Sequence, residues 1–224
     1  MPGYDYTIQL TMDSDTVKGL KGAGFVLYGF KAVQGPQSGV PTVWFKDPNF
    51  STTTTVQWSE SYQAFVSNVD PIPGGQIVDS DVADIKLGQQ APINSAGTFD
   101  TVITGDAGQI EIYNGATRQY TTGIAQYQGG SYQNLCAFPT FGQMVTSIVP
   151  IARVFLMFAT KAYATSTVVV QSSGPGFIID LTASNNRQVS YVLNGGWSSN
   201  GQSWGTAVAA NNPMNPFLIL QLSQ

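Results

Sequence analysis

Residues 4–12 read Tyr-Asp-Tyr-Thr-Ile-Gln-Leu-Thr-Met, and this stretch indicates the fold class. From Tyr6 to Met12 an apolar or aromatic side chain occupies every second position, and Thr or Gln fills the positions between. Alternation with a period of two places all the apolar side chains on one face of an extended strand. The chain therefore opens with a predicted β-strand that has one buried and one solvated face.

The same pattern recurs along the chain, with runs bounded by Gly, Pro, Asn and Ser. Alternating runs separated by turn-forming residues predict about 12 to 14 short strands. Residues 52–58 and 62–68 predict a hairpin whose loop is Ser59-Glu60-Ser61. The exception is residues 13–16, Asp-Ser-Asp-Thr, which offer an N-cap and predict one short helix near residues 15–22.

Together these signals predict an all-β fold, an antiparallel β-sandwich, with a barrel-like closure as the alternative. No repeat of fixed period occurs, which argues against a propeller or a solenoid. The strand pattern continues through the Pro- and Gly-rich break at residues 70–75. We therefore expect a single β-sandwich domain over residues 1–224.

Charge is scarce in this chain, since Asp, Glu, Lys and Arg make up only 10% of it and the net charge is −4. Typical domains carry about 25% charged residues. Of the nine basic residues only Lys18 and Lys21 lie close together. Nucleic acid and anionic lipid require a basic stripe, so we expect no nucleic-acid partner. A neutral polar surface suits neutral partners or self-association.

The amino-acid composition excludes most kinds of catalytic site. The chain has no histidine, which excludes the Ser-His-Asp triad, the Cys-His dyad and most zinc sites. The single cysteine, Cys136, lies between apolar neighbours and is expected to be buried and inert. We expect no enzyme activity, no cofactor and no metal site.

Carboxylates provide the two exceptions that the sequence leaves open. Asp79, Asp81 and Asp84 lie close together, which leaves calcium binding undecided. Asp79 and Asp84 are also the candidates for a paired-carboxylate glycoside hydrolase, a minor alternative because sequence spacing does not fix their separation. The simplest interpretation of this segment is a solvated strand edge.

The N-terminus has neither a basic region nor an apolar core, so it does not match a secretory signal peptide. Synthesis in the cytoplasm is the expectation, and release by a route without a signal peptide stays open. No apolar stretch is long enough to predict a transmembrane helix.

Aromatic residues beside predicted turns form the candidate ligand-binding set. Loops cluster at the ends of a sandwich, where binding residues commonly lie. An aromatic plate flanked by amides and hydroxyls suits a sugar ring or a lipid headgroup. The alternative is that these rings pack over the sandwich edge. The candidates are Trp197, Trp204, Tyr127, Tyr132 and Asn200.

These features predict a non-enzymatic surface-binding protein, lectin-like or membrane-active, whose partner is a cell-surface glycan or a lipid headgroup. A defence protein or a pore-forming toxin belongs to this class, and the Thr-rich segment 51–68 would be its membrane hairpin. The alternative is a self-assembling structural or inclusion-type protein, because low charge and many strand edges favour association. A homo-oligomer is compatible with both.

Overall fold

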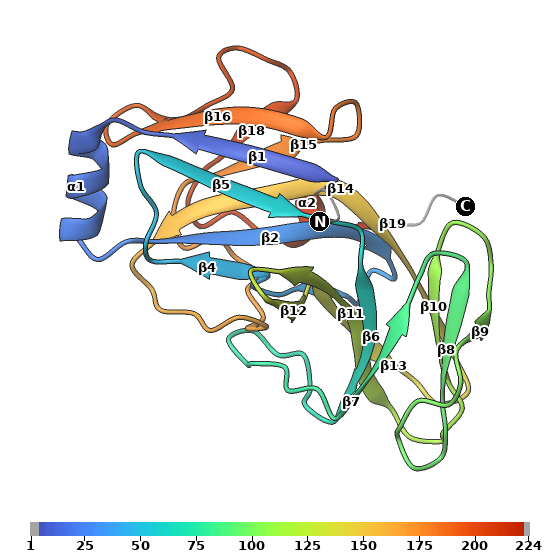
Figure 1. Cartoon of the computed structure of the whole chain (residues 1–224). Coiled ribbons are helices and arrows are strands. Elements are labelled where there is room, and N and C mark those ends of the chain that lie inside the picture. Colours follow the sequence, from blue (N-terminus) through green and yellow to red (C-terminus); the bar gives the residue numbers. More distant parts are fainter. Residues whose placement is uncertain (1–4, 222–224) are drawn as a thin grey trace.

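The computed structural model describes residues 5–221 and confirms the all-β sandwich. Its described part contains nineteen strands and two helices, arranged in three sheets without a closed barrel (Figure 1). More strands form than the sequence predicted because several are only two or three residues long. The predicted helix is confirmed as α1 (Ser14–Gly22), which Asp13 caps by accepting a 2.6 Å hydrogen bond from the Thr16 amide. A second helix, α2 (Asn215–Leu218), precedes the last strand.

The first sheet has four strands, in the order β17 (Gly196–Ser198), β16 (Asn186–Val192), β1 (Tyr6–Thr11) and β5 (Thr53–Trp58). In β5 the predicted alternation is visible as burial: Thr54, Val56 and Trp58 face inward and the residues between them are exposed. β1 runs antiparallel to β5 and parallel to β16. The sequence predicted antiparallel pairing, and this parallel pair, like two others in the second sheet, departs from that prediction.

The second sheet has nine strands, and its longest member, β14, pairs with three others. The strands are β18 (Gly205–Val208), β15 (Gly176–Asp180), β14 (Val145–Ala159), β10 (Ile110–Asn114), β8 (Gln89–Ile93), β9 (Ile103–Thr104), β2 (Val26–Gly35), β19 (Ile219–Gln221) and β4 (Phe45–Asp47). The register of β14 against β2 shifts between Pro150 and Val154. Residues 145–148 of β14 pair with β10, and residues 153–157 pair with β15.

The third sheet has six strands: β3 (Val40–Pro41), β13 (Cys136–Thr140), β11 (Tyr120–Gln128), β6 (Tyr62–Ser67), β7 (Asp81–Ile85) and β12 (Ser131–Asn134). The predicted hairpin of residues 52–58 and 62–68 is wrong. β5 pairs with β1 in the first sheet, whereas β6 pairs with β11 and β7 in the third. The segment Ser59–Ser61 is therefore a crossing between sheets.

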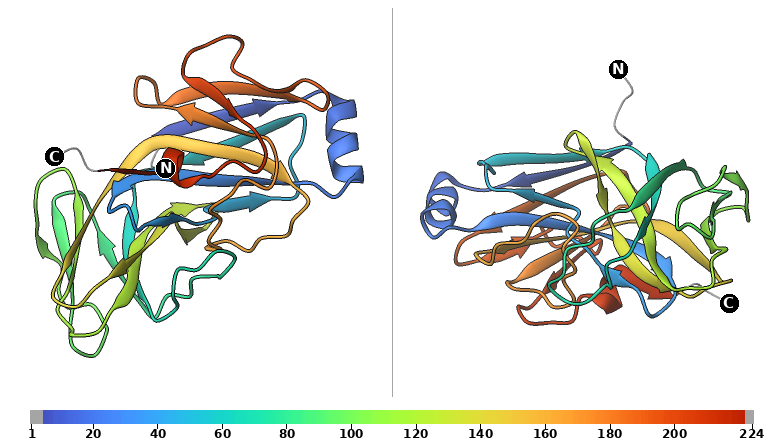
Figure 2. Two further views of the ribbon diagram at one scale, coloured as in Figure 1. Left: turned by 180° about the vertical axis from the view of Figure 1, so that it is seen from behind. Right: turned by 90° about the horizontal axis from the view of Figure 1, so that it is seen from below.

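The three sheets share one large apolar cluster, and two smaller apolar clusters lie beside it. The right-hand view of Figure 2 shows the sheet with β1 and β5 lying over the part of the second sheet that contains β2 and β14. Ile8 and Leu10 of β1 belong to the same buried cluster as Leu27 of β2 and Leu156 of β14. Ile124 of the third sheet joins this cluster too. The three sheets meet where segment 59–61 crosses.

Candidate functional site

A lysine is buried at the meeting point of the sheets. Lys31 lies on β2 and is only 1% exposed. Its ammonium nitrogen lies 5.4 to 5.9 Å from the centres of four aromatic rings. The rings belong to Tyr6, Trp44, Trp58 and Tyr62. We call these five residues the lysine cage. Ring faces attract a cation, so the four rings favour a charged Lys31.

Burial dominates the electrostatics of the lysine cage. Loss of hydration lowers the pKa of Lys31 from 10.5 to about 7, and the negative charge of Glu60 opposes this fall. Burial also raises the pKa of the Tyr62 hydroxyl, and Glu60 adds to that rise. The Tyr62 hydroxyl, like the indole nitrogens of Trp44 and Trp58, is buried without a hydrogen-bond partner. The cage is therefore rich in donors and poor in acceptors.

One buried amide links the lysine cage to the protein surface. The Lys31 ammonium donates a 2.7 Å hydrogen bond to Oε1 of Gln126 on β11. The Nε2 of Gln126 donates to the backbone carbonyl of Ser59 at 3.1 Å. The Tyr127 amide in turn donates to the Ser61 carbonyl at 3.3 Å. Lys31 and Gln126 thus hold the 59–61 crossing against the end of β11.

The end of β11 carries a pair of predicted site residues. Tyr127 of β11 lies opposite Tyr132 of β12 in the hairpin register, and their rings meet edge to face at 5.4 Å. Tyr127 is 42% exposed. The hydroxyls of Tyr132 and Ser61 are hydrogen-bonded at 2.6 Å. The structure therefore brings Tyr127 and Tyr132 together and ties them to the crossing.

A cavity of about 350 Å³ opens beside this tyrosine pair. Its lining comes from β12, from the 59–61 crossing and the first residue of β6, from the end of β7, and from the start of β8. The full lining is Glu60, Ser61, Tyr62, Asp84, Ile85, Lys86, Gln89 and Tyr132. We call it the tyrosine cavity. It offers carboxylates, an ammonium, an amide and hydroxyls around aromatic walls, which can orient a polar ligand.

Trp197 is placed elsewhere and packs into the core. It is 9% exposed and stacks on Phe158 and Phe177, with ring centres at 5.4 and 6.1 Å. Its indole nitrogen donates to the Pro175 carbonyl at 3.1 Å. Both ring faces and the polar edge are thus occupied within the protein. Trp197 offers no ring surface to a ligand, so we leave it outside the candidate site.

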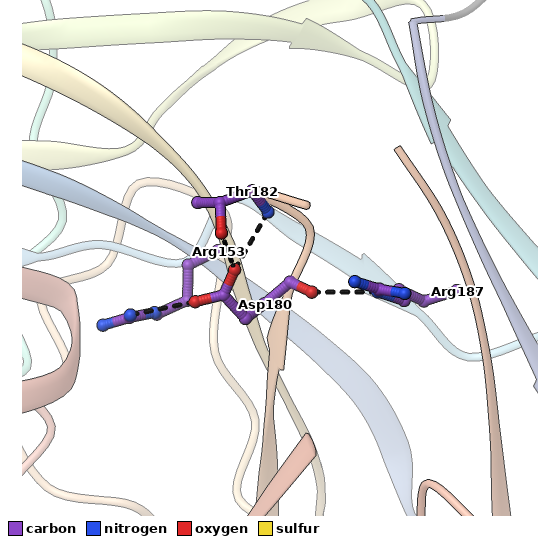
Figure 3. Close-up of polar contacts among 4 residues, drawn as sticks. All are labelled: Arg153, Asp180, Thr182 and Arg187. Atoms are coloured by element: carbon purple, nitrogen blue, oxygen red, sulfur yellow. Dashed lines mark hydrogen bonds and ion pairs between the residues drawn. The ribbon is translucent and has the colours of Figure 1, made fainter. Parts of the chain in front are cut away.

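Trp204 is covered by an arginine that belongs to a polar cluster. The Arg187 guanidinium lies over the Trp204 ring at 4.9 Å. Figure 3 shows Arg187 donating to the backbone carbonyl of Asp180, whose carboxylate accepts from Arg153 and Thr182. The Arg153–Asp180 ion pair measures 3.0 Å. This cluster ties β14, β15 and β16 together, which gives Trp204 a packing role.

The remaining candidates do not join the tyrosine cavity as a group. Asn200 lies in an exposed turn with a positive φ of 55°, a conformation that Asn tolerates. Asp79, Asp81 and Asp84 accept hydrogen bonds from three different partners: Asn134, the Phe99 amide and Gln63. Within residues 5–221 no three His, Cys, Asp or Glu side chains gather as a metal site. Only Asp84 borders the cavity.

Sequence analysis missed the central residues of this site. Lys31 interrupts the apolar run of residues 25–33, and a charge in such a run was an available signal of a paired, buried group. Gln126 and Glu60 carry no comparable signal, because their roles depend on contacts between sheets. Cys136 is buried, and its burial raises the pKa of the thiol to about 12.

Comparison of this chain with protein-family models, with curated proteins and with solved structures gave no match. No helix within the described residues is both long and apolar enough to cross a membrane.

Proposed function

We propose that this chain is a non-catalytic glycan-binding protein whose site is the tyrosine cavity. The observation that carries the proposal is the pair of exposed Tyr127 and half-buried Tyr132, which lies beside a cavity bordered by groups that donate and accept hydrogen bonds. Tyr62 also borders the cavity, and the pKa of its buried hydroxyl is raised by burial and by the nearby Glu60 carboxylate.

The chemistry of the lining matches that of a sugar. A sugar ring has apolar C–H faces and a rim of hydroxyls that both donate and accept. Tyrosine rings supply amphipathic contact area at low entropic cost. Glu60 and Asp84 accept from sugar hydroxyls, whereas Lys86 and Gln89 donate to them. A cavity that combines both kinds of contact fixes a neutral polyhydroxylated ligand in one orientation.

The same lining contains the one arrangement that could support catalysis. Glu60 and Asp84 border a single cavity, and glycoside hydrolases use two carboxylates across the scissile bond. We place these two groups in binding, as acceptors for sugar hydroxyls. The test of the proposal therefore includes product analysis of every bound oligosaccharide.

The experiment is a glycan array followed by calorimetry on the best binder, with the full chain. Tyr127→Ala should weaken binding at least tenfold, because the Tyr127 ring packs edge to face against Tyr132, which borders the cavity, and extends the aromatic surface beside it. Tyr132→Phe keeps the ring, removes the hydroxyl bonded to Ser61, and should weaken binding less. Tyr113→Ala, on β10 in the second sheet, is the matched control and should bind as the wild type does.

Three outcomes contradict this proposal. The first is an array without binders at high micromolar concentration. The second is a Tyr127→Ala variant that binds as tightly as the wild type. The third is cleavage of a bound oligosaccharide, with Glu60→Gln and Asp84→Asn abolishing the turnover, since that result would make the site catalytic.

A membrane-active role is the second candidate, and a separate observation favours it. The turn between β13 and β14 exposes Phe141 and Met144 by 61% and 56%, and Val145, the first residue of β14, is 45% exposed. Large apolar side chains at an exposed tip can enter a lipid interface. Co-sedimentation with neutral phosphatidylcholine vesicles tests this role. Phe141→Ser should abolish sedimentation, and the Tyr127→Ala variant should retain it; the absence of wild-type sedimentation contradicts this candidate.

A further inference from the structure

The β11–β12 hairpin has two faces of different chemistry. Side chains alternate along a strand, so Tyr127 and Tyr132 share one face and the residues beside them point to the other. Gln128, Ser131 and Gln133 occupy that second face. Together with Phe45 and Lys46 of β4 they border a separate cavity of about 260 Å³. Figure 1 shows β4 beside the β11–β12 hairpin. We call it the amide cavity.

The charge of the amide cavity differs from that of the tyrosine cavity. Its lining is Trp44, Phe45, Lys46, Gln128, Gly129, Ser131, Gln133 and Thr165, with one ammonium and no carboxylate. The ion pairs of residues 5–221 are Lys18–Asp15 and Arg153–Asp180, so the exposed Lys46 has no acidic partner within 4.0 Å. The tyrosine cavity, by contrast, holds Glu60 and Asp84 against Lys86.

The amide cavity also presents polar groups suited to an anion. Lys46 brings a full positive charge, and Gln128, Ser131 and Thr165 bring amide and hydroxyl donors. Donors without carboxylates favour a ligand group that only accepts, such as a carboxylate or a sulfate.

Strand β12 separates the two cavities, and one of its two edges is not paired with another described strand. Among the described strands β12 pairs only with β11. An extended ligand can therefore cross β12 at Tyr132 and Gln133, whose side chains point into opposite cavities. Gly129 and Gly130, both with positive φ, form the turn that connects β11 to β12.

We propose that the amide cavity is a second subsite, which binds the carboxylate or sulfate of an acidic oligosaccharide whose neighbouring sugar occupies the tyrosine cavity. This inference rests on the proposed glycan-binding function and names its ligand class. The ligand spans more than one sugar unit, carries its negative charge on the Lys46 side, and presents neutral hydroxyls to Glu60 and Asp84.

The experiment compares oligosaccharides of equal length by calorimetry at low and high salt. The probes are neutral cellohexaose and maltohexaose, a hexagalacturonate that carries carboxylates, and a heparin hexasaccharide that carries sulfates. At least one acidic probe should bind tenfold or more tightly than both neutral probes, and the preference should shrink as salt screens the charge. The two acidic probes distinguish carboxylate from sulfate recognition.

Lys46→Gln should remove the preference for the acidic probe and leave neutral binding unchanged. Lys161→Gln removes the same charge from an exposed lysine outside both cavities and should keep the preference. Equal binding of neutral and acidic probes overturns this inference and leaves the proposed function standing. Equal losses in the two lysine variants also overturn it, because they show general charge attraction. If no probe of either kind binds, both proposals fail.

Discussion

Replacement of Lys31 by methionine should remove a specific pH dependence of stability. The folded protein holds the pKa of Lys31 at about 7, against 10.5 for an exposed lysine. Between these values the unfolded chain binds a proton that the folded chain lacks, so the free energy of unfolding rises with pH. The full difference corresponds to roughly 5 kcal/mol.

Part of this change in the free energy of unfolding can be measured near neutral pH. From about pH 6 to about pH 8.5, titration of Lys31 should raise the free energy of unfolding by roughly 2 kcal/mol. The raised pKa of Cys136, about 12, lowers stability as its thiolate forms in the unfolded chain, and this happens mainly above the window. Attraction of the ammonium to the four rings opposes the trend but, on this account, does not cancel it.

The assay is urea denaturation followed by tryptophan fluorescence at both pH values. Lys31→Met fills the lysine cage with an unbranched apolar chain and should lose the rise between the two pH values. At the lower pH it should be at least as stable as the wild type, because apolar replacements of buried ions are often neutral or stabilising. Lys161→Met, at an exposed position, is the control and should keep the wild-type rise.

Two results would refute this reasoning. A wild-type stability that does not change between the two pH values would show that the rings and Gln126 offset the burial of the charge completely. Parallel profiles for the wild type and Lys31→Met would show that another group causes the dependence.

Three further predictions concern packing and ionisation. Gly123→Ala should lower stability by about 1 to 3 kcal/mol in a urea titration, because its new methyl group would lie 2.2 Å from the Cys136 carbonyl oxygen; an unchanged midpoint contradicts this. Cys136 should react with a thiol reagent only as fast as the protein unfolds, since the thiol is buried and its pKa is raised; rapid labelling of the native protein is the opposing result. Burial raises the pKa of Asp180, but hydrogen bonds from Thr182 and Arg153 outweigh it and the net pKa is lowered, so the group stabilises the fold above its unfolded pKa. Asp180→Asn should therefore cost about 1 kcal/mol at neutral pH, and this cost should vanish as acid protonates the wild-type carboxylate; a cost that is equal at both pH values argues against the ion pair.

Alternation in the sequence predicted which side chains are buried, and it did not predict which strands pair. In β5 the inward positions of Thr54, Val56 and Trp58 follow directly from the period of two. The hairpin to residues 62–68 failed because the period says nothing about the partner strand, and the three-residue link crosses between sheets instead of turning back. The parallel pairing of β1 with β16 joins segments far apart in the chain, which no local signal encodes.

In the candidate site, too, the sequence predicted local features and did not predict contacts between distant strands. Tyr127 and Tyr132 were predictable because they flank a Gly-Gly turn, which brings the two strand ends together. Trp197 flanks a similar turn and yet is buried, because the rings of Phe158 and Phe177 come from other strands to cover it. Burial of a loop aromatic depends on tertiary neighbours, and those are absent from a local pattern.

The most direct test of the central claim is a crystal structure of the full chain with an oligosaccharide selected from the array. The account predicts sugar density against Tyr132, with hydroxyls within hydrogen-bond distance of Glu60 or Asp84 and an acidic substituent near Lys46. A saccharide bound at another surface, with the tyrosine cavity filled only by water, would contradict it.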